Sequence, residues 1–589
     1  MTEHAETPKN GKTSHSGKNS KTSRSSKPRN TGKADSELVF VALGGLGQIG
    51  MNVYLYGLGP ANDRRWLMVD LGLTFPGVSE PGVDIVLPDL RFIQDEKSAL
   101  AGIFITHAHE DHIGAVLELW PSLQAPIYAT PFAAGMLKAK FAEYGGRELP
   151  KVHEVKPGSR FDVGPFDLEL VSMSHSIPET SGVAIRTPHG MVLHTADWKL
   201  DAEPLVGAPT DETKIKALGE EGVTALICDS TNAFRDGTSP SEAAVAQSLT
   251  EIIGKAKRRV AITTFASNVA RVKAVADAAK ATGRQLVISG RSLHRVIQVA
   301  IDTGYLPRDF SYLDQENFSH LAPEETLALL TGSQGETRAA LARIASGDHR
   351  DIKLARGDLV IYSSRSIPGN EKSILEVQNK LAELGCTVMT DGDGLVHVTG
   401  HPRRDELAKI FAWVKPKILI PMHGEARHLK ENARLAIEAG IPDVRTVLNG
   451  EMVRLAPGKS KVIDDVPVGR YFRDGRLVIS EGEGSVRERR KLSVVGLVAV
   501  ALAITPKGEV LGDIDIELDG VPEEDARGEL MEDIVFDAID GTLDSIPMKR
   551  RKDPEMVREA VRRSVRAAVD RAWGKRPIVK VLMNIVPAK

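Results

Sequence analysis

A cluster of metal-ligand side chains constrains the fold of this chain more than any other feature. Three histidines and two carboxylates lie within positions 107–112, directly after the apolar run Gly102–Ile105. The run predicts a buried strand, and the apolar residues 113–120 predict the start of a helix. A strand-to-helix turn that gathers imidazole and carboxylate groups favours zinc or a similar divalent ion. A solvated polar loop is the alternative, which the specific HxHxDH spacing disfavours.

The spacing of these residues predicts two ions. Alternate residues of an extended segment point the same way, so His107 and His109 are expected to hold one ion. Asp111 and His112 lie beyond the turn and are expected to face another. Three later apolar runs, each predicted as a strand, end in further candidates. The first ion is then assigned to His107, His109 and His175, the second to Asp111, His112 and His423, and Asp197 bridges both.

Length and composition predict a soluble protein of two to four domains. The chain has 589 residues, of which 42% are apolar and 26% charged, and a net charge of −3 that gives no overall case for a polyanionic partner. Two cysteines cannot form a disulfide framework, and the first residues lack the apolar segment of a signal peptide, so a cytoplasmic protein without membrane association is expected. The longest apolar run, 492–505, is too short to cross a bilayer and predicts core strands.

The two ends of the chain differ from its middle. Residues 1–36 have eight basic and three acidic residues and few apolar ones, which predicts disorder. This tail is either a weak tether for nucleic acid or a solubilising segment. Beyond a linker at 481–485, the sequence predicts a small α+β domain with a helix over 525–539. A later helix presents an arginine face that either meets RNA or a second subunit, or is simply solvated.

Some 226 residues separate Asp197 from His423, which is far more than one strand and helix need. Predicted strands alternate with helices in this stretch, and that order is typical of a parallel α/β domain. Several of these strands end in small hydroxyl, amide and glycine residues, and backbone N–H groups at such helix starts bind phosphate well. We therefore expect a separate phosphate-binding domain inserted into the metal-binding one.

The segment 395–402 follows the insertion. His397, Thr399 and His401 alternate along it, so they are expected to share one face of an extended segment. One interpretation is a polar strand edge. The other is a phosphate grip with a proton-transfer histidine beside the metals.

The order of these motifs resembles the metallo-β-lactamase superfamily, whose αββα fold places a metal site at one edge of two packed sheets. An insertion bounded by Asp229, His401 and His423 resembles the β-CASP nucleases, and within them the bacterial ribonuclease J family. The stretches that carry this resemblance cover roughly residues 38–430: LGGLGQIG at 43–50, THAHEDHIGA at 106–115, DSTNA at 229–233, TGSQGE at 331–336, IPGNE at 367–371, HVTGH at 397–401 and PMHGE at 421–425.

The resemblance implies a domain plan and an activity. The plan is a tail at 1–36, a metallo-β-lactamase domain at 37–232 and 389–480, a β-CASP insertion at 233–388 and a C-terminal α+β domain at 481–589. The implied activity is hydrolysis of RNA in the 5′-to-3′ direction from 5′-monophosphate ends, together with internal cleavage. Such an enzyme would take part in RNA maturation and decay. Two zinc ions per subunit are expected, with manganese or magnesium as alternatives. A homodimer or homotetramer and partners in RNA degradation are also implied.

The resemblance further assigns roles to single residues. Asp229 and His401 correspond to an acid/base pair. A structural calcium site is implied, for which Asp84 and Asp474 are the candidates, although the residues around Asp474 match the family pattern poorly. The implied substrate-binding elements are Ser267, Asn268, His397, Val398, Thr399, Gly400 and His401.

Three other functions fit parts of the sequence. A small-ester or lactam hydrolase shares the fold, but it has no need of an insertion of well over a hundred residues. A DNA-directed β-CASP nuclease is the closer rival, because only recognition of the 2′-OH separates RNA from DNA. A non-enzymatic RNA-binding scaffold would be expected to lack metal ligands, whereas all seven candidates are present.

Overall fold

Two large sheets pack face to face in the part of the molecule that carries the metal-ligand candidates. The computed structural model describes residues 36–144 and 150–587, so all but the last residue of the predicted tail lies outside the described residues. The first sheet has the order β24 (Lys461–Asp465), β23 (Glu451–Ala456), β1 (Glu37–Gly44), β3 (Val53–Gly59), β4 (Arg65–Val69), β6 (Leu100–Ile105), β7 (Ile127–Ala129) and β8 (Val152–Glu154). The second has the order β22 (Asp443–Val444), β20 (Ile418–Met422), β13 (Val223–Asp229), β12 (Gly190–His194), β11 (Ser181–Thr187), β10 (Phe166–Ser172) and β9 (Arg160–Val163).

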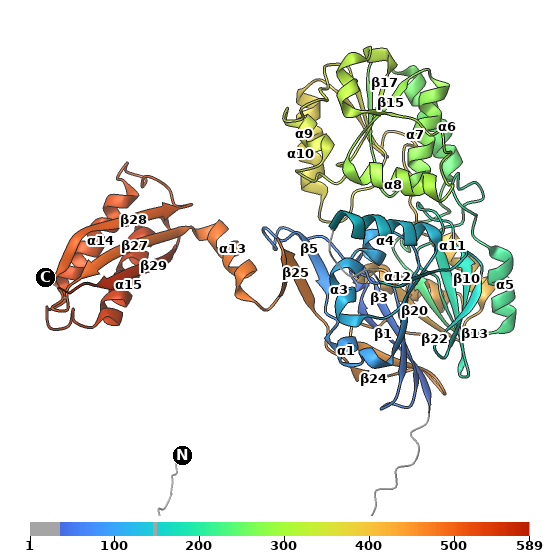
Figure 1. Cartoon of the computed structure of the whole chain (residues 1–589), viewed down its shortest axis with the longest axis horizontal. Coiled ribbons are helices and arrows are strands. Elements are labelled where there is room, and N and C mark those ends of the chain that lie inside the picture. Colours follow the sequence, from blue (N-terminus) through green and yellow to red (C-terminus); the bar gives the residue numbers. More distant parts are fainter. Residues whose placement is uncertain (1–35, 145–149, 588–589) are drawn as a thin grey trace, which may run out of the picture.

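Apolar side chains from both sheets form the core between them. Phe40 and Phe104 of the first sheet belong to one buried cluster with Leu168 and Ile227 of the second. Helices cover the two outer faces. On one side lie α1 (Arg91–Asp95), α3 (Val116–Leu123) and α4 (Pro131–Tyr144), and on the other α5 (Glu212–Glu221), α11 (Arg404–Val414) and α12 (Ala426–Glu438). This layering is the expected αββα sandwich (Figure 1).

A second body is inserted between β13 and β20, which pair in parallel in the sandwich. Its six-stranded sheet is entirely parallel, as the alternation of strands and helices predicted. The strand order is β16 (Leu313–Asp314), β15 (Gln285–Ser289), β17 (Thr326–Leu330), β14 (Val260–Thr263), β18 (Leu359–Tyr362) and β19 (Thr387–Met389). One face packs on α6 (Glu242–Lys255), α7 (Val269–Ala281) and α8 (Arg291–Asp302), and the other on α9 (Ala340–Ala345) and α10 (Glu371–Glu383).

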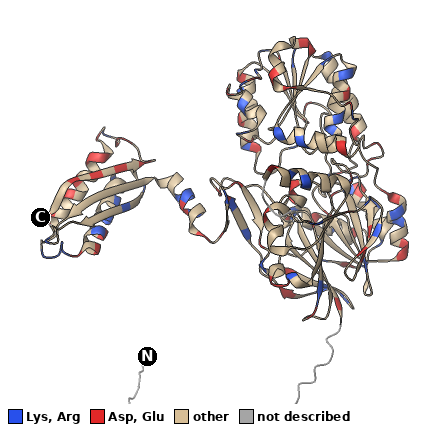
Figure 2. Cartoon of the chain, viewed as in Figure 1, with Lys and Arg blue, Asp and Glu red and all other residues tan. Residues whose placement is uncertain are grey.

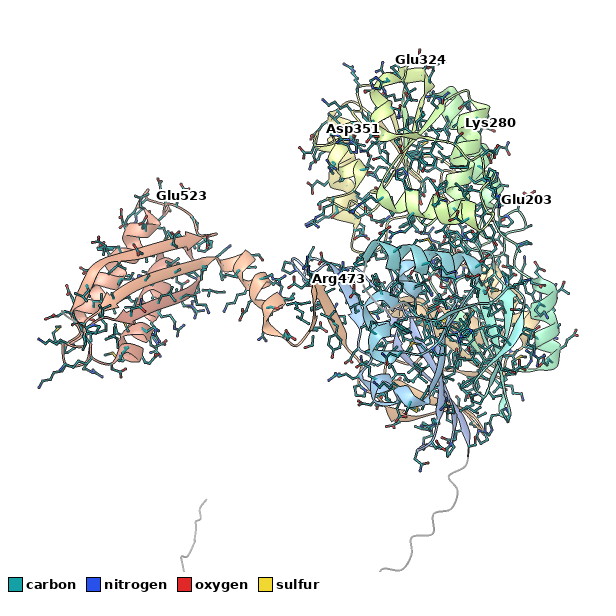
Figure 3. The ribbon with its side chains drawn as sticks, in the orientation of Figure 1. Glu203, Lys280, Glu324, Asp351, Arg473 and Glu523 are labelled. Carbon is teal, nitrogen blue, oxygen red and sulfur yellow. The ribbon has the colours of Figure 1, made fainter. Side chains whose placement is uncertain are left out.

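The C-terminal region forms a third body, which Figure 1 shows apart from the sandwich at the far end of α13 (Gly484–Val495). The small sheet β5 (Ile85–Pro88), β25 (Arg470–Asp474) and β26 (Leu477–Ser480) precedes this helix. In Figure 3, Arg473 of β25 lies at the sandwich end of this connection. The third body is a sheet of β28 (Val510–Asp519), β27 (Leu497–Ile504) and β29 (Ile578–Ile585) that packs on α14 (Met531–Ser545) and α15 (Pro554–Trp573).

Two expectations for this region were wrong. Residues 492–495 end α13 and do not form strand, because the helix continues until Gly496, whose N–H bonds Leu492 O and whose φ is 65°. The helix expected from residue 525 begins only at Met531. The reason is a local turn in which Asp525 accepts hydrogen bonds from the backbone of Arg527 and Glu529.

Charged residues are spread over the whole of the described structure. Basic and acidic residues are interspersed over all three bodies (Figure 2). Within residues 36–144 and 150–587, no helix is long and apolar enough to cross a membrane.

Candidate two-metal site

Four donor atoms converge where β6, β10 and β12 end. His107 and His109 follow β6, His175 follows β10, and Asp197 follows β12. The Nδ1 atom of His109 lies 3.1 Å from Nε2 of His107 and 3.0 Å from Nε2 of His175. Oδ2 of Asp197 lies 3.8 Å from His107 Nε2 and 3.7 Å from His175 Nε2. These residues form one of the groups with metal-ligand geometry, and its members are those expected for the first ion.

A second group shares the same carboxylate oxygen. His112 Nε2 lies 3.3 Å from Oδ2 of Asp197 and 3.6 Å from Oδ2 of Asp111. His423 follows β20, and its Nε2 atom lies 3.1 Å from Asp111 Oδ2. Asp111, His112, Asp197 and His423 therefore form the second group that the sequence predicted. Asp197 belongs to both groups, and its Oδ2 atom lies within 3.8 Å of a histidine nitrogen of each.

The spacing of these donors fits bound metal. Zinc–nitrogen bonds of about 2.05 Å in a tetrahedron place neighbouring donor atoms about 3.3 Å apart. The distances of 3.0–3.8 Å between neighbouring donors bracket this value. The other carboxylate oxygen, Asp197 Oδ1, is buried and has no hydrogen-bond partner in the described protein. His423 Nδ1 lies 3.5 Å from this oxygen, so a protonated His423 or a bound metal can supply the positive charge that the buried carboxylate needs.

A ring of outer contacts fixes the imidazoles. His112 Nδ1 lies 2.7 Å from Asp70 Oδ2, and His175 Nδ1 lies 2.7 Å from the carbonyl oxygen of Gly400. Such contacts set the tautomer and orientation of a metal-binding histidine. His423, Ala196 and Asp70 adopt left-handed backbone conformations, with φ of 51°, 54° and 64°. Non-glycine residues in this region are strained, and strain of this kind gathers at functional sites.

The electrostatics divide the histidines into two kinds. Burial lowers the pKa of His109 to about 4 and holds that of His107 and His175 well below its usual value. These three rings are therefore neutral and keep a lone pair for a ligand. Burial also acts on His423, but Asp197 and Asp111 outweigh it and raise its pKa to about 10. Without a metal, a proton supplies the positive charge that the carboxylates demand at this second group.

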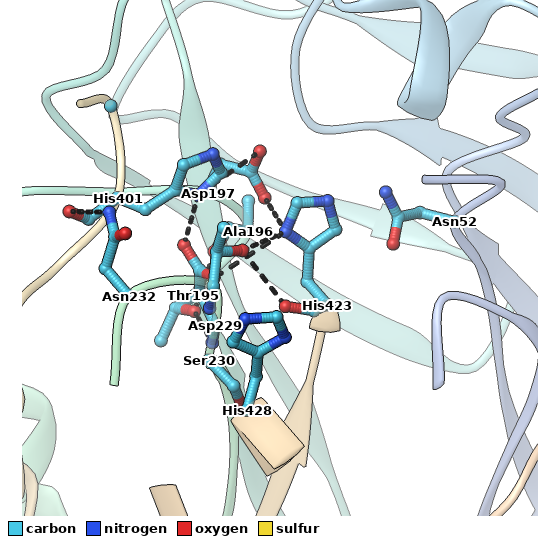
Figure 4. Close-up of polar contacts among 12 residues, drawn as sticks. Asn52, Thr195, Ala196, Asp197, Asp229, Ser230, Asn232, His401, His423 and His428 are labelled. Carbon is cyan, nitrogen blue, oxygen red and sulfur yellow. Dashed lines mark hydrogen bonds and ion pairs between the residues drawn. The ribbon is translucent and has the colours of Figure 1, made fainter. Parts of the chain in front are cut away.

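Asp229 and His401 lie together beside Asp197 and His423, as Figure 4 shows, and these four residues form a third group with metal-ligand geometry. His401 Nδ1 is 2.7 Å from Asp229 Oδ2, and Asp229 Oδ1 accepts the N–H of Thr231 at 2.9 Å. Burial opposes protonation of His401, but Asp229 and Asp197 raise its pKa above the usual value. Asp229 is fully buried, so His401 is its principal charged partner other than His423, whose Nδ1 is 3.6 Å away.

The segment 395–402 does not form the extended strand that its alternation predicted. The N–H of His401 bonds Thr399 Oγ1 at 3.2 Å, which closes a turn. Because of this turn, His397 and His401 do not share a face. His397 lies among Arg271 and Lys199, and burial together with these two cations lowers its pKa to about 3. It is therefore a neutral side chain away from the acid/base pair.

The remaining candidates have structural partners. Asn268 is buried and caps α7, its Oδ1 accepting the N–H of Arg271 at 2.8 Å, while Ser267 beside it is half-buried. Asp84 Oδ2 accepts the N–H of Gly475, and Asp474 is paired with Arg489. Among the described residues, the groups with metal-ligand geometry do not include the two calcium candidates. The arginine supplies the charge that a cation would otherwise provide to Asp474.

Sequence reasoning gave no site role to two residues that contact the ligands. Asp70 accepts the N–H of Thr106 and contacts His112, and its only sequence signal was a carboxylate at a predicted strand end. Asn52 Nδ2 lies 3.0 Å from His112 Nε2, and no motif marks it. Glu110, which lies among the ligands in sequence, pairs with Lys140 of α4.

The fold and the shared carboxylate define a metallo-β-lactamase-fold hydrolase with an inserted domain. Models of known families match the chain in four places: the Beta-lactamase superfamily domain at 65–216, the Ribonuclease J beta-CASP domain at 257–381, the Zn-dependent metallo-hydrolase RNA specificity domain at 394–446 and the Ribonuclease J C-terminal domain at 484–585. A solved structure of a protein of unknown function from Enterococcus faecalis covers 71% of this chain and all of its own, with a TM-score of 0.50 and 15% identity, which supports the fold alone.

Curated relatives narrow the class to one family. Ribonuclease J of Sinorhizobium meliloti is 50% identical over 94% of this chain and 98% of its own length. Ribonuclease J of Mycolicibacterium smegmatis is 38% identical over 93% of this chain and 97% of its own, and that of Corynebacterium glutamicum is 38% identical over 93% and 75%. The chain belongs to the ribonuclease J family, a family of metal-dependent ribonucleases.

Proposed function

We propose that this protein hydrolyses RNA with two divalent ions, removing nucleotides from 5′-monophosphate ends in the 5′-to-3′ direction and also cutting internally. One observation carries the proposal: the donor group of His107, His109 and His175 and that of Asp111, His112 and His423 both include Asp197. The Oδ2 atom of Asp197 lies 3.7 Å from His175 Nε2 and 3.3 Å from His112 Nε2. Two ions held this close would supply positive charge to the phosphoryl oxygens and an activated water. Zinc suits the imidazole-rich donor set, with manganese or magnesium as alternatives.

The residues of the chain perform the proton chemistry in this proposal. Asp229 holds His401 through Nδ1, which leaves Nε2 of the ring as the atom that exchanges a proton with the substrate. The His401 side chain is 19% exposed, so this edge can be reached from solvent. Asp229 itself is buried and orients the histidine. A general acid held in this way contributes typically 10²–10⁴-fold to a rate.

The inserted domain receives the end of the RNA. Ser267 and Asn268 lie at the N-terminus of α7, where backbone N–H groups favour an anion. The segment 397–400 joins the insertion to His401 and contacts His175 through Gly400. The 5′-phosphate would be held at the turn formed by Ser267 and Asn268, and the next phosphodiester bond would lie at the metals. This arrangement explains the release of one nucleotide per step.

Product length from a labelled 5′-monophosphate RNA tests this function. Mononucleotides are expected, together with slower hydrolysis of a 5′-triphosphate RNA and of the matching DNA. H107A/H109A should abolish hydrolysis and leave the fold intact, whereas H320A at an exposed histidine should not change it. Faster cleavage of the DNA would favour a DNA-directed nuclease, and equal cleavage would show that the 2′-OH is not recognised. Full activity of metal-stripped H107A/H109A would exclude the two-metal mechanism.

The setting of this activity is also a proposal. The domain plan, with boundaries at 36, 232, 388 and 480, assigns residues 481–589 to assembly into a homodimer or homotetramer. The protein is proposed to act in the cytoplasm, with partners in RNA degradation. Light scattering of the full chain and of a chain ending at 480 tests the assembly: the shorter chain is expected to be a monomer.

A further inference from the structure

Four charged side chains outside the metal cluster are buried between the sandwich and the insertion. Lys199, Glu242 and Arg271 are inaccessible to solvent, and Asp201 is 4% exposed. Lys199 Nζ lies 2.8 Å from Asp201 Oδ2 and 3.6 Å from Glu242 Oε1. Glu242 Oε2 accepts a hydrogen bond from Arg271 Nη2 at 2.8 Å. We call these four residues the buried ion-pair chain.

One end of the buried ion-pair chain is fixed to the metal site. Lys199 follows the shared ligand Asp197 by two residues. Its backbone N–H bonds the carbonyl oxygen of Ser174 at 2.9 Å, directly before the ligand His175. A shift of Lys199 would therefore move the backbone that carries two proposed ligands of the first ion.

The other end is fixed to the insertion. Arg271 lies in the first turn of α7, and its N–H bonds Oδ1 of Asn268. Asp201 Oδ2 accepts the N–H of Glu242 at 2.9 Å, at the first residue of α6. In Figure 3, Glu203, whose N–H bonds Asp201 Oδ1, lies on the side where the insertion meets the sandwich. The chain of contacts thus runs from the metals to the Ser267–Asn268 turn.

The buried ion-pair chain is poorly suited to a purely stabilising role. Arg271 Nε and Nη1 and Glu242 Oε1 are buried without a hydrogen-bond partner among the described residues. Buried ion pairs with unsatisfied atoms are often no more stable than apolar residues of similar volume. What this pair provides is a constraint on distance, because the one charge-assisted hydrogen bond from Arg271 Nη2 to Glu242 Oε2 holds the first turn of α7 against the start of α6.

Glu406 connects further backbone segments at the boundary between the sandwich and the insertion. Its carboxylate is fully buried and accepts the backbone N–H groups of Leu200 at 2.7 Å, Ser239 at 3.1 Å and Arg403 at 2.9 Å. Leu200 follows Lys199, while Ser239 and Arg403 lie where the chain enters and leaves the insertion. Through Glu406, the loop after Asp197 is therefore connected to both segments that link the sandwich to the insertion.

We propose that the buried ion-pair chain is a positioning element that sets the spacing between the metal site and the Ser267–Asn268 turn, and so determines how many nucleotides are removed per step. This inference rests on the proposed function, in which that turn receives the 5′-phosphate. Lys199, which has its own 2.8 Å contact with Asp201, supports the backbone of Asp197 and His175. Glu242 and Arg271 act through Asn268, and none of the three residues touches the substrate. Loss of the ion pairs should therefore change where the RNA is cut more than it changes hydrolysis itself.

The test compares two substrates on the full-length, metal-loaded protein. The variant E242L/R271M replaces the central pair by apolar side chains of similar volume. K273Q/D277N removes an exposed ion pair of the same helix, in which the two charged groups lie 2.6 Å apart, and serves as the control. The first substrate is a 5′-monophosphate RNA, whose products report step length. The second is bis(p-nitrophenyl) phosphate, which needs the metals and no 5′-end pocket.

The expected result separates position from stability. E242L/R271M should hydrolyse the small diester like the wild type, but release mixed mononucleotides and dinucleotides from RNA at a rate lower by roughly 10- to 100-fold, the cost of about 1 Å of misplacement. The control variant should match the wild type on both. If E242L/R271M does not fold, R271M alone gives the same comparison, because it removes the donor to Glu242 Oε2 and leaves Glu242 beside Lys199.

Two results would overturn the inference. One is an unchanged product ladder with the pair removed. The other is an equal loss on both substrates, which would assign the pair to general stability. Failure of the proposed function looks different, because the wild type itself would then not release mononucleotides from 5′-monophosphate RNA.

Discussion

Replacement of Gly400 by alanine tests how closely the insertion is joined to the first metal site. A Cβ atom at this position would lie 2.4 Å from both Cε1 and Nδ1 of His175. Ordinary contacts of this kind are about 3.5–4.0 Å, so the ring must move by about 1 Å or more. It would also lose its 2.7 Å contact with the Gly400 carbonyl oxygen.

The size of the effect follows from that displacement. Loss of an outer partner of a metal-binding histidine typically costs 10- to 100-fold in metal affinity, and G400A also displaces the ligand itself. We expect a drop of about 100-fold in affinity for one of the two ions, and a similar loss of activity at limiting metal. Titration with zinc, followed by mass spectrometry of the native protein, measures both ions separately.

Gly394 provides the matched control in the same segment. A Cβ atom there would meet only Ile252 Cδ1, at 4.0 Å, so G394A should bind both ions like the wild type. Binding of two ions by G400A with unchanged affinity would contradict this expectation, since the clash would then be relieved without movement of His175.

Three further perturbations have defined outcomes. D70N replaces the carboxylate that holds His112 Nδ1 at 2.7 Å. In the same titration it should weaken the affinity for one ion by 10- to 100-fold, while the other ion stays bound. Equal weakening of both affinities would contradict the assignment of His112 to one ion. E110Q should leave RNA hydrolysis near the wild-type rate, because Glu110 pairs with Lys140 and not with the ligands; a large loss of rate would give Glu110 a place in the metal site. Burial lowers the pKa of His194 to about 3 from 6.5, so the unfolded chain binds a proton that the folded protein excludes, and this histidine costs stability increasingly as the pH falls from 6.5 toward 3. In urea titrations, the free energy of unfolding of the wild type should therefore fall by about 2 kcal/mol more between pH 7 and pH 5 than that of H194Q. Identical pH dependence of the two proteins would contradict this.

Local spacing explains what could be predicted from the sequence. His107, His109, Asp111 and His112 are neighbours, so the geometry of one strand end and one turn is sufficient to divide them between two groups. His175, Asp197 and His423 follow apolar runs, and strand ends gather at one edge of packed sheets. The parallel insertion was predictable for the same reason, because strands and helices alternate visibly along the chain.

Contacts between distant residues explain what could not be predicted. Alternation placed His397 and His401 on one face, but the bond from His401 N–H to Thr399 turns the backbone between them. The role of Asp70 depends on β4 lying beside β6, and the pairing of Glu242 with Arg271 depends on the packing of α6 on α7. Neither partner in such a pair carries a local pattern that identifies the other.

Anomalous diffraction from crystals of the zinc-loaded protein, recorded at the zinc absorption edge, locates the bound ions directly. Two peaks about 3.5–4 Å apart are expected, one on either side of Asp197. The first should contact His107, His109 and His175, and the second Asp111, His112 and His423. A single peak, or two peaks that do not share Asp197, would contradict the two-metal site.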